Sequence, residues 1–148
     1  MLPSYRDDMS FLKEYIQNLP AKESSWHVMP EFILDKYIDC GWSVKPDELE
    51  FLIEKIKNPA TQKELEAIYH LLALLIEENL ILLNTELISQ VETDLASTSI
   101  SRNYYAARFV QHNRLTEFTQ SIIVSTSRIQ SKWLREEMEY IINYLKRF

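Results

Sequence analysis

Glycine is nearly absent from this chain, since Gly41 is the only one among 148 residues. Glycine is the residue that most readily adopts left-handed turns, ends helices and lets the backbone approach a phosphate closely. A single glycine therefore excludes a glycine-rich nucleotide loop, a dinucleotide-binding fingerprint and a series of tight hairpin turns. A chain that must turn with proline, asparagine and serine instead is expected to be almost entirely helical.

Cysteine and long apolar runs are scarce as well. Cys40 stands alone, so it has no partner for an internal disulfide, which fits a reducing cytoplasm and a packing role. The longest unbroken apolar run covers residues 71–76, whereas a membrane-spanning helix needs about 20 such residues. The first residues, MLPSYRDDMS, lack a basic stretch followed by an apolar one, so we expect no secretion signal. These absences predict a cytoplasmic chain with no membrane partner.

Basic residues are missing from one long stretch. Between Glu64 and Ser101 there is no Lys or Arg. Residues 1–100 carry 8 Lys and Arg against 18 Asp and Glu, a net charge of −10, whereas residues 101–148 carry 8 against 4, a net charge of +4. Such a polarised chain either steers a basic partner or uses its acidic residues for solubility.

The remaining composition is that of an ordinary globular protein. The chain is 46% apolar and 26% charged, and its length suits one domain spanning residues 1–148. A domain of this size buries roughly 68–70% of its unfolded surface, which is enough for a core without disulfides or metals.

Apolar residues repeat at helical spacing along most of the chain. Capping and proline signals divide the pattern into seven or eight short helices, expected at about 5–18, 30–40, 46–57, 62–79, 85–95, 100–112, from about 115, and 129–146. The segment 121–127 is rich in β-branched residues but has no partner strand, so we expect it to be helical. The sequence predicts an all-α fold, either an irregular bundle or a short stack of antiparallel helix pairs.

Local signals place the ends of several of these helices. Ser4 is the expected N-cap of the first helix, and Pro46 opens the third. Pro30 occupies the position expected for a first helical residue, so the preceding segment 23–29 is predicted to be a loop or short turn. Gly41 is expected to end that helix in a left-handed conformation, with Trp42 folding back onto it.

No catalytic or metal-binding constellation is evident. The three histidines, His27, His70 and His112, lie on separate predicted elements, and a catalytic zinc ion needs three protein ligands. Glu77 and Glu78 point about 100° apart on a helix, so the two carboxylates do not converge. We therefore expect neither a metal nor another cofactor, and a chain that is not an enzyme.

One short segment resembles a known family. The run SRNYYAA at residues 101–107 resembles a Ser-Arg-x-Tyr-Tyr-Ala run common in HEPN proteins, small all-α domains that often act as RNases or as partners of RNases. The family's nucleases place a His four to six residues after an Arg and a polar residue. Here Ala107, Arg108 and Phe109 stand at those positions. His112 is the next histidine, which leaves an HEPN-like RNase as an alternative.

The C-terminal third also carries a partial nucleic-acid footprint. Six cationic side chains occur with nearby aromatic residues Tyr104 and Trp133; they are Arg102, Arg108, Arg114, Arg128, Lys132 and Arg135. The whole chain nevertheless carries a net charge of −6, and affinity for nucleic acids comes largely from neutralising phosphates. We therefore do not expect a nucleic-acid partner. A helical nucleic-acid regulator and a structural module are nevertheless kept as alternative functions of the chain.

The size, acidity, helical character and lack of catalytic residues resemble those of bacterial immunity proteins, including those of contact-dependent growth inhibition. That resemblance implies an inhibitor or antitoxin function, in which an acidic face covers the active site of a basic toxin nuclease. The acidic residues expected to bind the partner are Glu77, Glu78, Glu86, Glu92 and Asp94, with a second patch formed by Asp47, Glu48 and Glu50.

Overall fold

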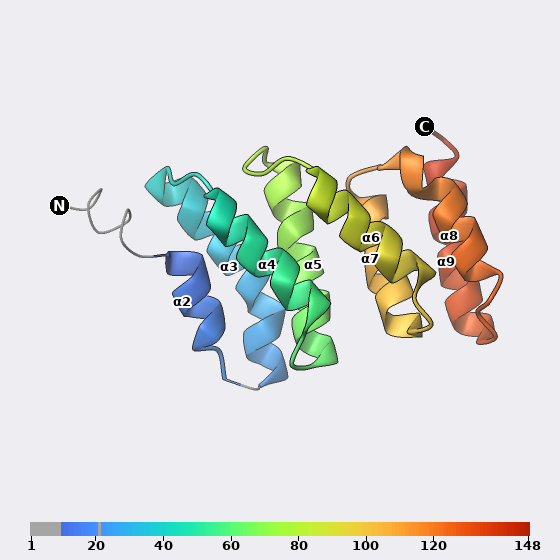
Figure 1. The fold of residues 1–148 in the computed structure, drawn as a ribbon, viewed down its shortest axis with the longest axis horizontal. Helices are drawn as coiled ribbons and strands as arrows, with labels where there is room; N and C mark the ends of the chain where they lie inside the picture. The colour runs from blue at the N-terminus through green and yellow to red at the C-terminus, as the bar shows by residue number, and fades with distance from the viewer. Residues whose placement is uncertain (1–9, 21) are drawn as a thin grey trace. The chain divides into compact units, whose positions relative to one another are not determined.

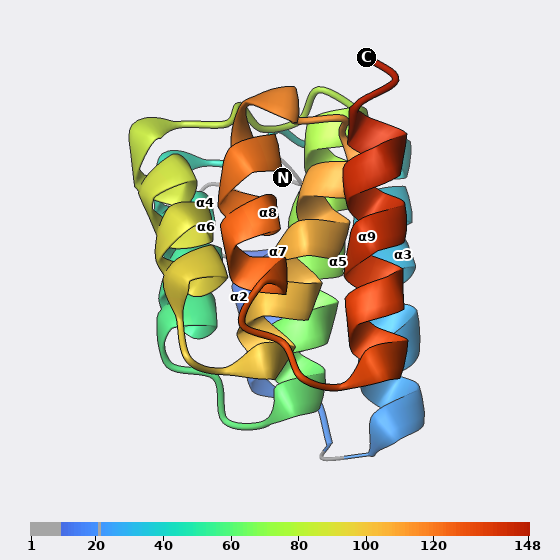
Figure 2. The same ribbon diagram turned by 90° about the vertical axis from the view of Figure 1, so that its right-hand side faces the viewer.

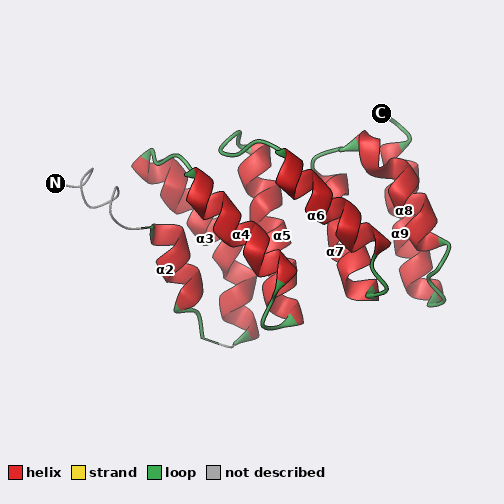
Figure 3. Cartoon of the chain, viewed as in Figure 1, coloured by secondary structure: helices red, strands yellow, loops and turns green. Residues whose placement is uncertain are grey.

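The computed structural model describes residues 10–20 and 22–148, except for the side chain of Glu23. These residues form eight α-helices and one short 3-10 helix, so the all-α prediction is confirmed (Figure 3). The chain divides into two compact units, residues 1–81 and 82–148. Unit 1 contains α2 (Phe11–Gln17), α3 (Glu23–Cys40), α4 (Pro46–Lys57) and α5 (Gln62–Glu77). Unit 2 contains α6 (Thr85–Ala96), α7 (Ile100–His112), η1 (Thr116–Phe118), α8 (Thr119–Thr126) and α9 (Lys132–Leu145).

Each unit is built from two stacked helix pairs. In unit 1, α4 packs on α2 while α5 packs on both α3 and α4 (Figure 1). In unit 2, α8 packs on α6 and α9 packs on α7, with α6 and α8 forming one layer and α7 and α9 the other (Figure 2). This arrangement matches the predicted stacking of antiparallel helix pairs within each unit. The prediction that residues 1–148 form one domain stays a prediction.

The core of unit 1 lies around α5. Leu65, Ile68, Leu71, Leu72 and Leu75 are almost fully buried, which agrees with the apolar pattern that surrounds this helix. Its N-cap, Thr61, accepts a hydrogen bond from the Glu64 backbone amide at 3.1 Å. Thr61 and Glu64 form only half of a capping box, because the Glu64 carboxylate bonds the backbone amide of Ala60 at 2.7 Å rather than that of Thr61.

Helix α3 corrects the predicted loop at 23–29. The helix begins at Glu23 and continues through Pro30, which lies inside it rather than at its start. An internal proline costs a helix about 3 kcal/mol because it removes a hydrogen bond and crowds the preceding turn. The buried side chains of Trp26, Met29, Ile33 and Tyr37 form one continuous apolar stripe across that position. Burial of each such side chain contributes roughly 1.5–3 kcal/mol, which outweighs the cost of the proline.

The C-terminus of α3 is the predicted glycine cap. Gly41 has φ +67°, and its amide donates to the Ile38 carbonyl at 3.2 Å. The Trp42 amide donates to the Tyr37 carbonyl at 2.9 Å, and the two aromatic rings meet edge to face at 5.4 Å. Trp42 therefore folds back onto the helix as expected.

Most other helix boundaries agree with the predictions to within about three residues. The exception is the first helix, expected at 5–18; residues 5–9 of that range lie outside the described residues. Helix α2 begins at Phe11 because Ser10 is its N-cap, accepting a bond from the Lys13 amide. The predicted cap Ser4 lies outside the described residues. The segment 121–127 is helical as predicted, in α8 and its C-terminal cap. In the last helix the apolar stripe ends at Leu145, and Phe148 is exposed.

Candidate functional site

Two of the eight predicted partner-binding residues are not on the surface. Glu48 is fully buried and Asp94 is 1% exposed. Because both carboxylates hold hydrogen bonds inside their own unit, neither belongs to an acidic face that a partner could cover. Sequence alone gives no warning of this, since an acidic residue in the first or last turn of a short helix is normally solvated.

Glu48 holds three elements of unit 1 together. Its Oε2 accepts hydrogen bonds from the Ser10 hydroxyl and the Tyr37 hydroxyl, both at 2.6 Å, and its Oε1 accepts one from the Lys45 amide at 2.9 Å. The Tyr37 hydroxyl in turn accepts a bond from the Leu12 amide at 3.3 Å. A buried carboxylate is tolerated only when donors of this kind surround it. The network therefore fixes α2 against α3 and α4.

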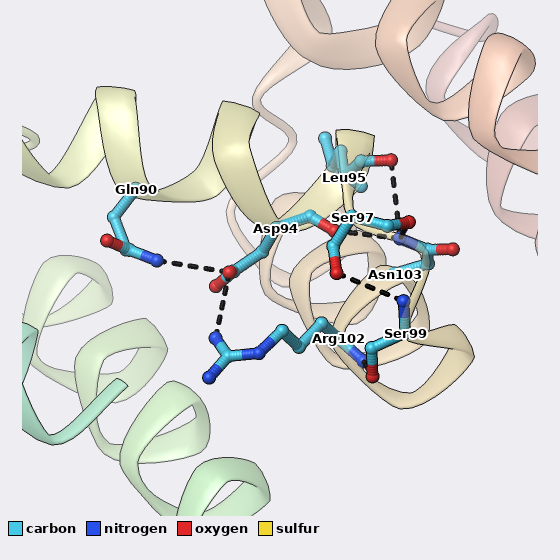
Figure 4. A network of polar contacts seen from close by, with 7 residues as sticks. All are labelled: Gln90, Asp94, Leu95, Ser97, Ser99, Arg102 and Asn103. Carbon is cyan, nitrogen blue, oxygen red and sulfur yellow. Dashed lines mark hydrogen bonds and ion pairs between the residues drawn. The ribbon is translucent and has the colours of Figure 1, made fainter. Parts of the chain in front are cut away.

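Asp94 fixes the turn between α6 and α7 (Figure 4). Its carboxylate oxygen Oδ1 accepts bonds from the Arg102 guanidinium at 2.9 Å and from the Gln90 side chain at 3.0 Å. The Asn103 side-chain amide lies within bonding distance of the carbonyls of Asp94, Leu95 and Ser97 at the end of α6. These contacts satisfy carbonyls that an α-helix leaves open at its C-terminus.

The other six predicted residues are exposed and are divided between the units. Asp47, Glu50, Glu77 and Glu78 belong to unit 1, and Glu86 and Glu92 to unit 2. Asp47 forms an ion pair with Lys13 at 2.7 Å, and the hydrogen bond from that lysine holds the pKa of the Asp47 carboxyl below its ordinary value. The acidic charge is concentrated in unit 1, which has 8 Lys and Arg against 15 Asp and Glu, a net charge of −7, whereas unit 2 has 8 against 7.

The outward side of α3 carries an acidic row that sequence reasoning missed. Glu31, Asp35 and Asp39 are exposed and follow one another at a spacing of four residues, which places them one above the next. In the described part of the chain, no hydrogen bond or ion pair involves their carboxylates. Like charges at this spacing destabilise a helix by about 0.2–0.5 kcal/mol per pair, a cost that a basic partner would offset.

Apolar side chains are interleaved with this row. Val28, Phe32 and Ile38 are 54%, 45% and 47% exposed, respectively. At 100° per residue, these three side chains and the three carboxylates fall within an arc of about 120° on α3. We call these six residues the α3 face. Exposed apolar groups beside charges are typical of protein-binding surfaces, where the apolar groups supply affinity and the charges supply steering.

An aromatic cluster joins the α3 face to α2. The Phe32 ring lies 4.9 Å from that of Tyr15 and 6.0 Å from that of Phe11, and Phe11 also contacts Trp42 at 5.8 Å. Phe11, Tyr15 and Trp42 are each partly exposed. Trp and Tyr are enriched among the residues that dominate binding energy at interfaces. Of the two tryptophans that flank the predicted second helix, Trp42 is thus accessible, whereas Trp26 is only 8% exposed.

The cations of the C-terminal third are largely used within unit 2. Arg102 bonds Asp94, Arg128 donates to the carbonyls of Leu95 and Ala96, and Arg135 donates to the carbonyl of Ile129. Arg108 lies 5.7 Å from the centre of the Tyr104 ring. Arg114 also donates to the Tyr144 hydroxyl at 3.3 Å, so four of the six cations of the predicted nucleic-acid surface hold hydrogen bonds within unit 2.

Arg102 of the HEPN-like run and His112, the next histidine along the chain, do not converge within one chain. Arg102 lies in the first turn of α7 and His112 at its last residue, so ten residues separate them by about 15 Å along the helix axis. Arg102 is also held by the buried Asp94.

The structure brings His27 and His70 to one small cleft between α3 and α5, together with Glu66 and Lys63. Within residues 10–20 and 22–148, however, no three His, Cys, Asp or Glu side chains are grouped in a way that could hold a metal ion. No helix among the described residues is both long and apolar enough to cross a membrane.

Comparison with known proteins adds no further constraint, because no family model, curated protein or solved structure matches the chain. The residues that bear on function are those of the α3 face and the aromatic cluster beside it.

Proposed function

We propose that this chain is a non-enzymatic inhibitor of the immunity type, which binds a basic toxin nuclease domain in the cytoplasm and covers its active site. The α3 face is the proposed binding surface. The observation that carries this proposal is the row of Glu31, Asp35 and Asp39, three exposed carboxylates interleaved with exposed apolar side chains.

The charge supports a basic partner of this kind. A nuclease surrounds its active site with cations that hold phosphates, and a row of carboxylates presents a similar pattern of negative charge. Unit 1 carries a net charge of −7, which accelerates encounter with a cationic surface and disfavours acidic partners. The exposed Val28, Phe32 and Ile38 would be desolvated in the complex, and their burial would supply affinity that salt does not screen.

A capture experiment tests this assignment. Wild-type protein is immobilised as bait for an extract of its host at low and at high salt, and the retained proteins are identified by mass spectrometry. We expect one basic protein that is retained at low salt and weakened by high salt, because the first contacts are between opposite charges. Retention of nucleic acid alone, or of no heterologous protein, would contradict the proposal.

Two matched variants locate the binding surface in the same experiment. The row variant combines Glu31→Gln, Asp35→Asn and Asp39→Asn. The patch variant combines Glu77→Gln, Glu78→Gln and Glu86→Gln, which removes the same number of exposed carboxylates from the stretch that lacks Lys and Arg. We expect the row variant to lose the partner and the patch variant to retain it. The reverse result would move the binding surface away from α3.

A further inference from the structure

A groove between α2 and α3 lies beside the α3 face. It is an open depression of about 530 Å³, and its walls include Phe11, Glu14, Tyr15, Asn18 and Val28. This volume falls in the range of pockets that receive small ligands. Its walls combine two aromatic rings with one carboxylate, so its chemistry is that of a site for an organic cation.

The rings of the groove already attract a cation of the chain itself. The Lys36 ammonium lies 5.9 Å from the centre of the Phe11 ring, and Phe11 stacks on Tyr15 with ring centres 5.7 Å apart. The negative face of an aromatic ring attracts cations at such distances, more strongly when the cation is desolvated. The stacked pair therefore provides a wall suited to a second cation on the groove side.

Polar groups on the rim of the groove complete the site. The Glu14 carboxylate makes no hydrogen bond or ion pair within the described part of the chain. Asn18 donates its side-chain amide to the Glu14 carbonyl at 2.8 Å, and its own amide oxygen is still available as an acceptor. A carboxylate and an amide oxygen on one rim match a group with several N–H donors.

We propose that this groove receives an arginine side chain of the basic partner. The guanidinium group is planar, so it stacks on Phe11 and Tyr15 while two of its N–H groups bond the Glu14 carboxylate. A lysine ammonium has the same charge but neither the plane nor the fork of donors. This inference rests on the proposed function and adds to it the kind of residue that the α2–α3 groove selects.

Peptides of nine arginines and of nine lysines serve as probes, because they match in charge and differ in this chemistry. Binding of each to the full chain is measured by titration calorimetry, and the Asn18 side-chain amide is followed by NMR. Wild type is expected to bind the arginine peptide about tenfold more tightly than the lysine peptide, with a shift of the Asn18 signal. Equal affinity for the two peptides, or binding of neither, would overturn the proposal.

Variants distinguish recognition of arginine in the groove from the general attraction of cations by the α3 face. Glu14→Gln and Tyr15→Leu should each reduce the arginine preference, whereas Glu136→Gln and Tyr140→Leu, at exposed residues of the same types on α9, should leave it unchanged. The row variant should weaken both peptides equally and keep the preference. Loss of affinity for both peptides in the row variant with no arginine preference in wild type would support the proposed function and refute the groove.

Discussion

Replacement of Arg102 by alanine is expected to lower the free energy of unfolding of unit 2 by about 3 kcal/mol. The guanidinium of Arg102 faces the carboxylate of Asp94, which is 1% exposed. Removing one partner of a buried ion pair leaves a desolvated charge, and this costs more than the pair contributes when intact. The Gln90 amide still donates to Asp94, so we place the loss at the lower end of the range for such replacements.

The measurement is urea denaturation combined with hydrogen exchange. Exchange protection should fall most in α6 and α7, because the hydrogen bonds from Arg102 and Gln90 to the Asp94 carboxylate and from Asn103 to the Asp94 carbonyl join these two helices. Arg108→Ala is the matched control, since Arg108 is exposed on the same helix and its loss should change stability by less than about 0.5 kcal/mol. Adding Asp94→Asn to Arg102→Ala should restore part of the loss by removing the buried charge. No recovery would contradict the electrostatic explanation.

Glu48→Ala should destabilise unit 1 by at least about 3 kcal/mol. The substitution leaves the hydroxyls of Ser10 and Tyr37 and the Lys45 amide without the carboxylate that they bond. The Tyr37 hydroxyl is the fully buried donor of the three, and a buried donor that loses its acceptor costs about 1–3 kcal/mol. The removed side chain also leaves a space in the core, which adds to the loss. Because this network fixes α2 against α3, the groove between the two helices should lose its shape as well.

Tyr37→Phe isolates the contribution of one hydroxyl to that network, the donor to Glu48 and the acceptor for the Leu12 amide. It removes the hydroxyl but keeps the ring, and we expect a loss of about 1.5–3 kcal/mol because the acceptor is a carboxylate. Glu50→Ala, at an exposed carboxylate on the same helix as Glu48, is the control and should be nearly neutral. Thermal unfolding followed by circular dichroism measures all three variants. Similar melting temperatures for Glu48→Ala and Glu50→Ala would mean that Glu48 does not hold the helices together.

The fold class and many helix ends can be predicted because they depend on local chemistry. The pattern predicts a helix at residues 100–112, and α7 has those bounds, since the serines before it offer a cap and Ser99 provides it. Gly41 ends α3 because a left-handed residue strongly favours glycine there. Proline is the misleading signal: Pro30 has the usual position of a helix start, but tertiary burial of Trp26 and Met29 extends α3 through it.

The binding surface is harder to predict than the fold. The pattern of charge along the sequence predicts that the partner binds the stretch without Lys or Arg. Burial in the fold decides which acidic side chains a partner can reach. Glu48 and Asp94 hold hydrogen bonds inside networks that reach other helices, through Tyr37 of α3 and Arg102 of α7, and no local signal predicts those contacts. The spacing of Glu31, Asp35 and Asp39 is visible in the sequence, but it begins one residue after the proline that predicts a helix start.

Inhibition of the captured partner tests the central claim most directly. The partner is purified, its nuclease activity is measured on a nucleic-acid substrate, and wild-type chain or the row variant is added in increasing amounts. Wild type should abolish the activity at about one equivalent, whereas the row variant should need at least about tenfold more, because three interfacial charges are lost. If the nuclease stays active in excess wild type, or if the row variant inhibits as well as wild type, the α3 face does not cover the active site of a toxin.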